Sequence, residues 1–96
     1  MQAHLSKNVL NHILSRHPEV VGHVQKITQA ILHPDLIALE MKGELKALKF
    51  YRELDIGPKF LIVLHREVRD EKVIITAYFT SNVNKVKGKI VWKRSQ

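Results

Sequence analysis

Apolar residues recur at helical spacing in the first third of the chain. They fall three or four positions apart in two series, a spacing that places side chains along one stripe of a helix. The series are Leu5, Val9, Leu10, Ile13 and Leu14, then Val20, Val21, Val24, Ile27, Ile31 and Leu32. Pro18 suits a first helical turn better than a helix interior, so we expect a break at Arg16-His17, with His17 near the cap of a second helix. That helix is expected to end near His33-Pro34.

Short β-prone runs separated by turn residues follow. The runs are LIALEM, ELKALKFYREL, KFLIVLHREV, VIITAYFT and KIVWK, and Gly or Asp stands in each turn between them. Connections of a few residues are too short for parallel crossovers. We therefore expect an α+β fold in which two N-terminal helices pack on one face of a four- to five-stranded antiparallel meander sheet. Residues 1–96 are expected to form a single domain.

The run VIITAYFT at 73–80 sorts its side chains into two sets, because successive residues of a strand point to opposite faces. The apolar set, expected against the helices, is Val73, Ile75, Ala77 and Phe79. The other set includes a row of hydroxyls from Thr76, Tyr78 and Thr80, expected away from the core, on the open side of the sheet or in a groove between the sheet and a helix edge. An open antiparallel face needs polar residues in any case, so a solvated surface and a ligand site both stay open.

The charge of the chain favours a polyanionic partner. Sixteen Lys and Arg against nine Asp and Glu give a net charge of +7. The excess is uneven, because residues 83–96 contain five cations and no anion: Lys85, Lys87, Lys89, Lys93 and Arg94. Nucleic acid is the leading partner class for such a surface, and a solubilising tail is the alternative.

Several classes of function are excluded or disfavoured. The chain has no cysteine, which excludes disulfides and thiolate chemistry and makes the cytoplasm the expected location. Its longest aliphatic or aromatic run, FLIVL, is far shorter than the roughly 20 residues of a membrane span, and no signal peptide is visible, so we expect no membrane partner. The sequence has no HExxH motif, no glycine-rich phosphate loop and only scattered carboxylates, so we expect no metal and no cofactor.

RNA cleavage needs neither a metal ion nor a cofactor, because the neighbouring 2′-OH of the RNA attacks the phosphate. The protein must supply a base, an acid, and cations or hydroxyl donors around the phosphorus. His12 and Arg16 lie four apart on one stripe of the first helix, and His17 follows at the break. Arg52 lies near the end of one strand and His65 near the end of the next.

Each of these residues also has a structural alternative. Histidines between helices often lie on the surface or at a cap, and Arg52 is able to pair with Glu53 or Glu67 across the sheet. Only one of His65 and Arg66 can share a sheet face with the hydroxyl row, and the register is not readable from the sequence.

The order of the segments resembles a known superfamily. HILSRHPEV, followed by ALKFYREL, KFLIVLHREV and VIITAYFTS, is similar to the phage-associated branch of the barnase, EndoU, colicin and RelE-like RNases over about residues 4–93. The resemblance implies a toxin-like, metal-independent endoribonuclease with RNA as substrate. It also allows for an antitoxin or immunity protein as a partner. The alternatives are a non-catalytic nucleic-acid-binding domain and a phage-type interaction module, because the superfamily contains inactive members.

The resemblance further implies an active site of a helix-borne His, a basic strand residue, and a hydroxyl with an aromatic on the late strand. On this sequence the corresponding residues are His12 or His17, Arg52, Thr76 and Tyr78. The expected substrate-binding residues are Arg16, His65, Thr80, Lys93 and Arg94. The sheet-borne Glu and His of barnase-like members have counterparts only in Glu53, Glu67 and His65.

Overall fold

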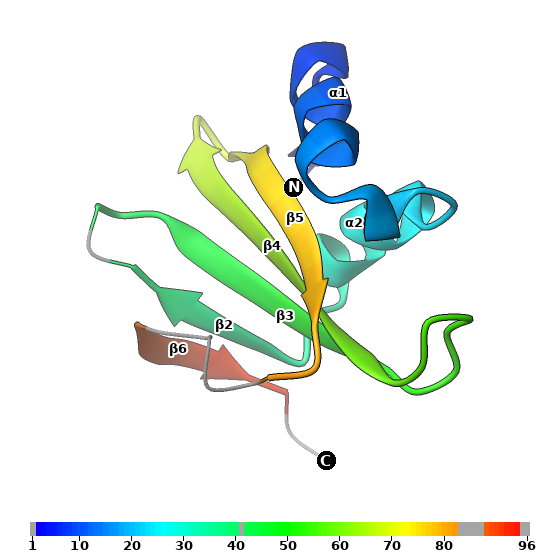
Figure 1. Ribbon diagram of the computed structural model, residues 1–96. Coiled ribbons are helices and arrows are strands. Elements are labelled where there is room, and N and C mark those ends of the chain that lie inside the picture. Colours follow the sequence, from blue (N-terminus) through cyan, green and yellow to red (C-terminus); the bar gives the residue numbers. More distant parts are fainter. Residues whose placement is uncertain (1, 41, 83–87, 95–96) are drawn as a thin grey trace.

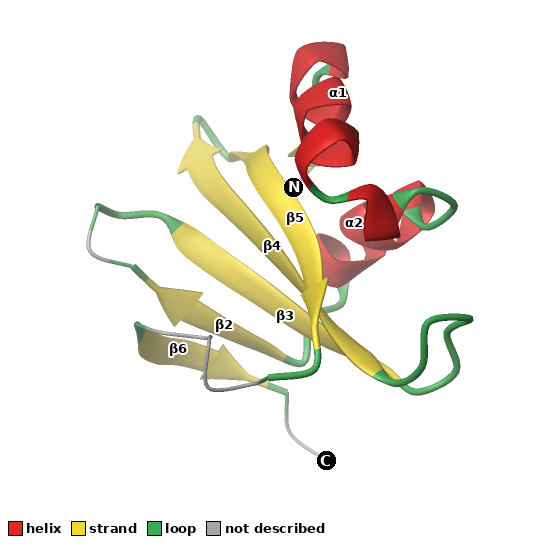
Figure 2. Ribbon diagram, in the orientation of Figure 1, coloured by secondary structure: helices red, strands yellow, loops and turns green. Residues whose placement is uncertain are grey.

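The computed structural model describes residues 2–40, 42–82 and 88–94. The elements in chain order are β1 (Gln2–His4), α1 (Lys7–Arg16), the 3-10 helix η1 (Pro18–Val20), α2 (Val24–Leu32), β2 (Leu36–Leu39), β3 (Leu45–Tyr51), β4 (Lys59–Val68), β5 (Glu71–Thr80) and β6 (Lys89–Lys93). The strands form one six-stranded sheet in the order β1-β5-β4-β3-β2-β6 (Figures 1 and 2). The α+β class is confirmed. None of the described helices is long and apolar enough to cross a membrane.

The helices end where the sequence predicts but do not all begin there. The hydroxyl of Ser6 accepts a hydrogen bond from the backbone N of Val9 and caps the start of α1, and His17 ends that helix. Pro18 opens only the short η1, because Gly22 follows with a φ of +86°, which an α-helix cannot contain. The second α-helix therefore begins later than expected, and it ends just before His33 as predicted.

The sheet differs from a simple antiparallel meander at both edges. Strands β2 to β5 pair antiparallel in chain order, as expected. At one edge β1 adds a short parallel pairing with the start of β5. At the other edge β6 pairs antiparallel with β2 rather than with β5. The sheet is therefore mixed, and the C-terminal strand lies far from the strand that precedes it in sequence (Figure 1).

The helices cover one side of the sheet, which we call the helix face, and the opposite side is the far face. The core between helices and sheet contains Ile13, Val20, Ile27, Ala30, Ile31, Ala47, Leu61, Val63, Ile74, Ala77 and Phe79. Ala77 and Phe79 therefore lie as the alternation predicts. The prediction for Val73 and Ile75 is wrong, because Ile74 is buried in this core instead.

A β-bulge explains that difference. Thr76 lies opposite Leu64, whereas Ile74 lies opposite His65, so Ile75 is an extra residue without a partner across the strands. The extra residue shifts the alternation by one position and turns Ile74 toward the helices. Val73 and Ile75 instead line a groove with the side chain of Arg66.

Candidate functional site

His17 and Tyr78 come from distant parts of the chain and meet at the edge of β5. Their ring centroids are 5.4 Å apart with a tilt of 31°. The Nδ1 of His17 lies 3.8 Å from the Oε2 of Glu19, and the same oxygen accepts a hydrogen bond of 3.4 Å from the backbone N of Phe79. The side chains of His17 and Glu19 are each about one-third exposed. Glu19 thus connects η1 to β5 and lies on the Nδ1 side of the imidazole, and Nε2 has no partner among the described residues.

A second feature is a groove of about 480 Å³ at the ends of β2, β3 and β6. Its lining consists of Asp35, Leu36, Leu48, Lys49, Phe50, Arg52, Phe60, Lys93 and Arg94. The rings of Phe50 and Phe60 lie 5.0 Å apart with a tilt of 50°. Arg52 and Lys93 make no hydrogen bond or ion pair with any described residue, so the alternative of an Arg52 ion pair across the sheet is not formed there. The groove therefore combines unpaired cations with aromatic rings.

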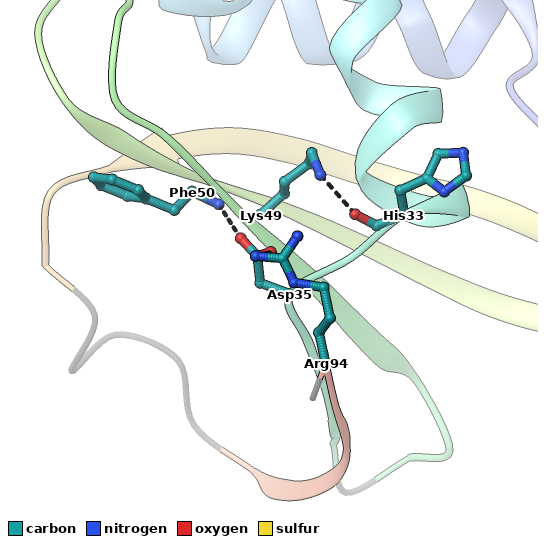
Figure 3. A network of polar contacts seen from close by, with 5 residues as sticks. All are labelled: His33, Asp35, Lys49, Phe50 and Arg94. Atoms are coloured by element: carbon teal, nitrogen blue, oxygen red, sulfur yellow. Dashed lines mark hydrogen bonds and ion pairs between the residues drawn. The ribbon is translucent and has the colours of Figure 1, made fainter. Parts of the chain in front are cut away.

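Asp35 organises this groove (Figure 3). Its Oδ2 accepts a hydrogen bond of 2.8 Å from the backbone N of Phe50, and its Oδ1 lies 3.1 Å from the guanidinium of Arg94. Lys49 and Phe50 point to opposite sides of β3, because they are neighbours on a strand. Lys49 donates to the carbonyl of His33 at the end of α2, at 2.8 Å, while Phe50 points away from α2. The Phe50 ring therefore belongs to the far face.

Aromatic residues of the far face lie between the His17 cluster and the groove. Thr80 lies opposite Phe60. Tyr78 lies two residues earlier on the same side of β5, so it is a diagonal neighbour of Phe60, a position at which the Cα atoms are about 7–8 Å apart. Phe60 in turn lies opposite Phe50 on β3. A row of three rings therefore runs from the imidazole of His17 to the cations of the groove.

Positive charge on the far face is concentrated at the groove. Toward the opposite ends of the strands, Lys46 forms an ion pair of 2.6 Å with Glu40, and Arg66 forms one of 2.7 Å with Glu44. These pairs neutralise the cations there. The expected cations Lys85 and Lys87 lie outside the described residues.

The remaining predicted site residues lie elsewhere or have other partners. His12 and Arg16 are exposed on α1 and contact no polar partner among the described residues. Thr76 is half-buried on β5 opposite Leu64. Thr80 is buried, and its hydroxyl accepts a hydrogen bond of 3.1 Å from the backbone N of Asn82, so it stabilises the end of β5.

His65 lies on the helix face and is fully buried. Neither ring nitrogen has a hydrogen-bond partner among the described residues. Burial, and then the nearby Lys72 cation, lower the pKa of His65 to about 4. The structure thus answers the question of register: Arg66 shares the far face with the hydroxyl row, and His65 does not.

Sequence reasoning missed Glu19, Asp35 and the two phenylalanines of the groove. Glu19 stands two residues after His17, separated from it by Pro18, and this closeness is a signal for a contact. Asp35 comes directly before β2, where a carboxylate often bonds to backbone N–H groups. Phe50 and Phe60 carry no such signal, because apolar residues in strands are usually core residues.

The described residues contain no group of three or more His, Asp or Glu side chains placed to hold a metal ion. Comparisons with protein families, curated proteins and solved structures find no match to this chain. Its function is therefore inferred from the geometry of the far face and from the resemblance of its segments.

Proposed function

We propose that this protein is a metal-independent endoribonuclease that binds RNA on the far face of its sheet. The observation that carries the proposal is the contact of His17 with both Glu19 and Tyr78, on a sheet that also carries a groove with unpaired cations. The RNase resemblance implies a helix-borne His, a basic strand residue and a late-strand aromatic. His17, Arg52 and Tyr78 fit those roles and lie along one row of side chains.

The proposed reaction uses the 2′-OH of the RNA as its nucleophile. A bond forms between the 2′ oxygen and phosphorus while the bond from phosphorus to the 5′ oxygen breaks, which yields a 2′,3′-cyclic phosphate and a 5′-hydroxyl. One proton leaves the 2′-OH and another reaches the 5′ oxygen. His17 carries out one of these transfers through Nε2, because Glu19 lies on the Nδ1 side, and solvent water exchanges the other proton.

Tyr78 and Arg52 are assigned to different phosphates of the RNA, because Phe60 and Phe50 lie between them on the far face. The guanidinium of Arg52 forms two parallel hydrogen bonds to the oxygens of a phosphate in the groove. The Tyr78 hydroxyl adds a donor beside the imidazole. Lys93 attracts the neighbouring phosphates of the same strand as a point charge.

The test compares cleavage of RNA in EDTA by the wild type, by His17→Ala and by the matched control His12→Ala. We expect His17→Ala to lower the cleavage rate by roughly two to four orders of magnitude, the usual contribution of a general acid or base, with little change in RNA affinity. His12→Ala should cleave like the wild type, because His12 is exposed on α1 and contacts none of the site residues. Cleavage that survives His17→Ala contradicts the assignment, and a wild type that cleaves no RNA contradicts the activity.

The groove itself favours one second candidate, a non-catalytic RNA-binding domain. Arg52, Lys93 and the exposed Phe50 ring are sufficient to bind a nucleic acid without any proton transfer. Under this alternative the wild type binds RNA with a strong salt dependence but leaves its length unchanged. The same cleavage assay therefore separates the two functions.

A further inference from the structure

We infer that the free side of the Phe50 ring is a stacking subsite for an unpaired nucleobase, which makes single-stranded nucleic acid the ligand of the groove. This inference rests on the proposed RNA-binding function, but it concerns residues that take no part in proton transfer. It is carried by the exposure of one ring, the rigidity of its support and the charges beside it.

Phe50 presents a partly uncovered ring near the end of β3. Its exposed fraction is 40%, and at this position β3 pairs with β4 but no longer with β2, whose pairing stops at Leu48. Leu48, two residues earlier on the same face, is almost fully buried. Exposing a large apolar ring to water is unfavourable, so a ring that stays uncovered beside a groove is a candidate contact for an apolar surface of a ligand.

The Phe50 ring is held in place from two sides. Its backbone N donates to Asp35, which Arg94 holds in turn, and its ring packs against Phe60 at 5.0 Å between centroids. A base cannot enter between the two rings, because their centroids are only 5.0 Å apart and a base would need a full van der Waals separation from each ring. A base therefore stacks on the side of Phe50 that faces the groove, and Phe60 acts as the support.

The charges of the groove identify the rest of the ligand as anionic. Asp35 is the sole carboxylate among the described residues that line it, and Arg94 already neutralises it. Arg52 and Lys93 remain without partners among the described residues and are able to bind phosphate oxygens. The volume of about 480 Å³ lies in the range of small-molecule sites, which is roughly 300–1,000 Å³. An aromatic ring beside two free cations matches a base attached to a phosphate.

The exposed ring favours single-stranded over double-stranded nucleic acid as the ligand. In a duplex each base is already stacked and paired, so neither face is available to Phe50. An unpaired base can turn out of the chain and stack on the ring while its phosphates reach the cations. We therefore expect tight binding of single strands and weak binding of duplexes of the same length.

The experiment measures binding of a fluorescent single-stranded RNA oligonucleotide to the full chain carrying His17→Ala, which is expected to prevent cleavage. Adding Phe50→Ala should weaken binding by about 5- to 150-fold, the usual effect of losing one base-stacking ring. Phe50→Tyr should retain the affinity, since it keeps the ring, and Phe50→Leu should lose it while still filling apolar space. The matched control is Val21→Ser, which alters a side chain that is 62% exposed outside the groove.

Two further ligands separate the base from the phosphate. Adenosine monophosphate should bind more weakly to Phe50→Ala than to its parent, whereas ribose 5-phosphate should bind both proteins equally. Arg52→Gln should weaken both ligands. The inference is overturned if Phe50→Ala and Phe50→Leu bind the single strand as their parent does, or if an RNA duplex binds as tightly as the single strand.

The failures of the two proposals are distinguishable. A wild type that cleaves no RNA but loses affinity with Phe50→Ala keeps the subsite and rejects the nuclease. A wild type that cleaves RNA while Phe50→Ala changes nothing keeps the nuclease and rejects the subsite. Absence of any binding to single strands rejects both.

Discussion

The burial of His65 predicts that moderate acid weakens the fold. The side chain is fully buried, and neither ring nitrogen finds a partner among the described residues. Its pKa falls from 6.5 to about 4 because burial disfavours the imidazolium and because the Lys72 cation lies nearby. The neutral imidazole is therefore the form that the folded state favours. The resulting stability is complete above pH 6.5 and is lost as the pH falls toward 4.

The size of the effect follows from the two pKa values. Each pH unit between them is worth about 1.4 kcal/mol, so the full loss in the free energy of unfolding is about 3 kcal/mol. At pH 5 about 2 kcal/mol of this is already lost. Domains of this size are stable by only about 5–15 kcal/mol, so the change is large enough to measure.

Urea unfolding at pH 8, 6 and 5 tests this prediction with wild type, His65→Leu and the control His12→Gln. Leucine fills similar volume without a titrating group, so His65→Leu should gain about 2 kcal/mol relative to the wild type between pH 8 and pH 5. Other groups titrate equally in both proteins and cancel in this difference. His12→Gln should follow the wild type at every pH, because its side chain is exposed. A constant difference between wild type and His65→Leu across the three pH values would refute the reasoning.

Three further predictions concern single groups. The slope of log affinity for single-stranded RNA against log salt should become shallower by about 0.7 in Arg52→Gln. Arg66→Gln should keep the wild-type slope, because Arg66 is paired with Glu44. Equal slopes for all three proteins would contradict phosphate binding by Arg52. Gly88→Ala should lower the melting temperature more than Gly22→Ala does. Both glycines have positive φ, but only at Gly88 does an added Cβ collide with a backbone carbonyl, that of Leu39 on β2, and an equal fall would show that this close approach has no weight. Ser6→Ala should destabilise the protein by about 1 kcal/mol in urea unfolding through loss of the α1 cap, and Ser15→Ala, exposed within α1, is its neutral control.

The sequence predicts where helices and strands begin and end better than it predicts which strands pair with each other. The ends of α1 and α2 are readable because a periodic apolar stripe stops at a recognisable break. The strand β1 has three residues, too few for any periodic signal. The pairing of β6 with β2 depends on contacts between residues at least 50 positions apart, and no local pattern specifies them. The bulge in β5 is likewise invisible in an alternation that looks regular as far as Phe79.

The candidate site divides in the same way. Residue type and position single out His12, His17, Arg52 and Tyr78 as candidates, because imidazole, guanidinium and phenol carry distinctive chemistry, and the contact of His17 with Tyr78 distinguishes the two histidines. Nothing in the sequence distinguishes Phe50 from an ordinary strand residue, because exposure is a property of the assembled sheet. The opposite holds for His65, whose chemistry marked it as a candidate although its strand turns it into the core.

The pairing of β6 with β2 determines where the cations at the end of the sequence lie on the sheet. Had β6 followed β5 in a simple meander, Lys93 and Arg94 would lie at the β5 side of the sheet, away from Arg52. Pairing with β2 instead places Lys93 opposite Leu36 and brings Arg94 to Asp35. Arg94 thereby stabilises the groove through its ion pair with Asp35, and Lys93 adds an unpaired positive charge near Arg52. The pairing of β6 with β2 thus brings Lys93 and Arg94 into the groove that Arg52 lines, so two of the five C-terminal cations lie at one place on the sheet.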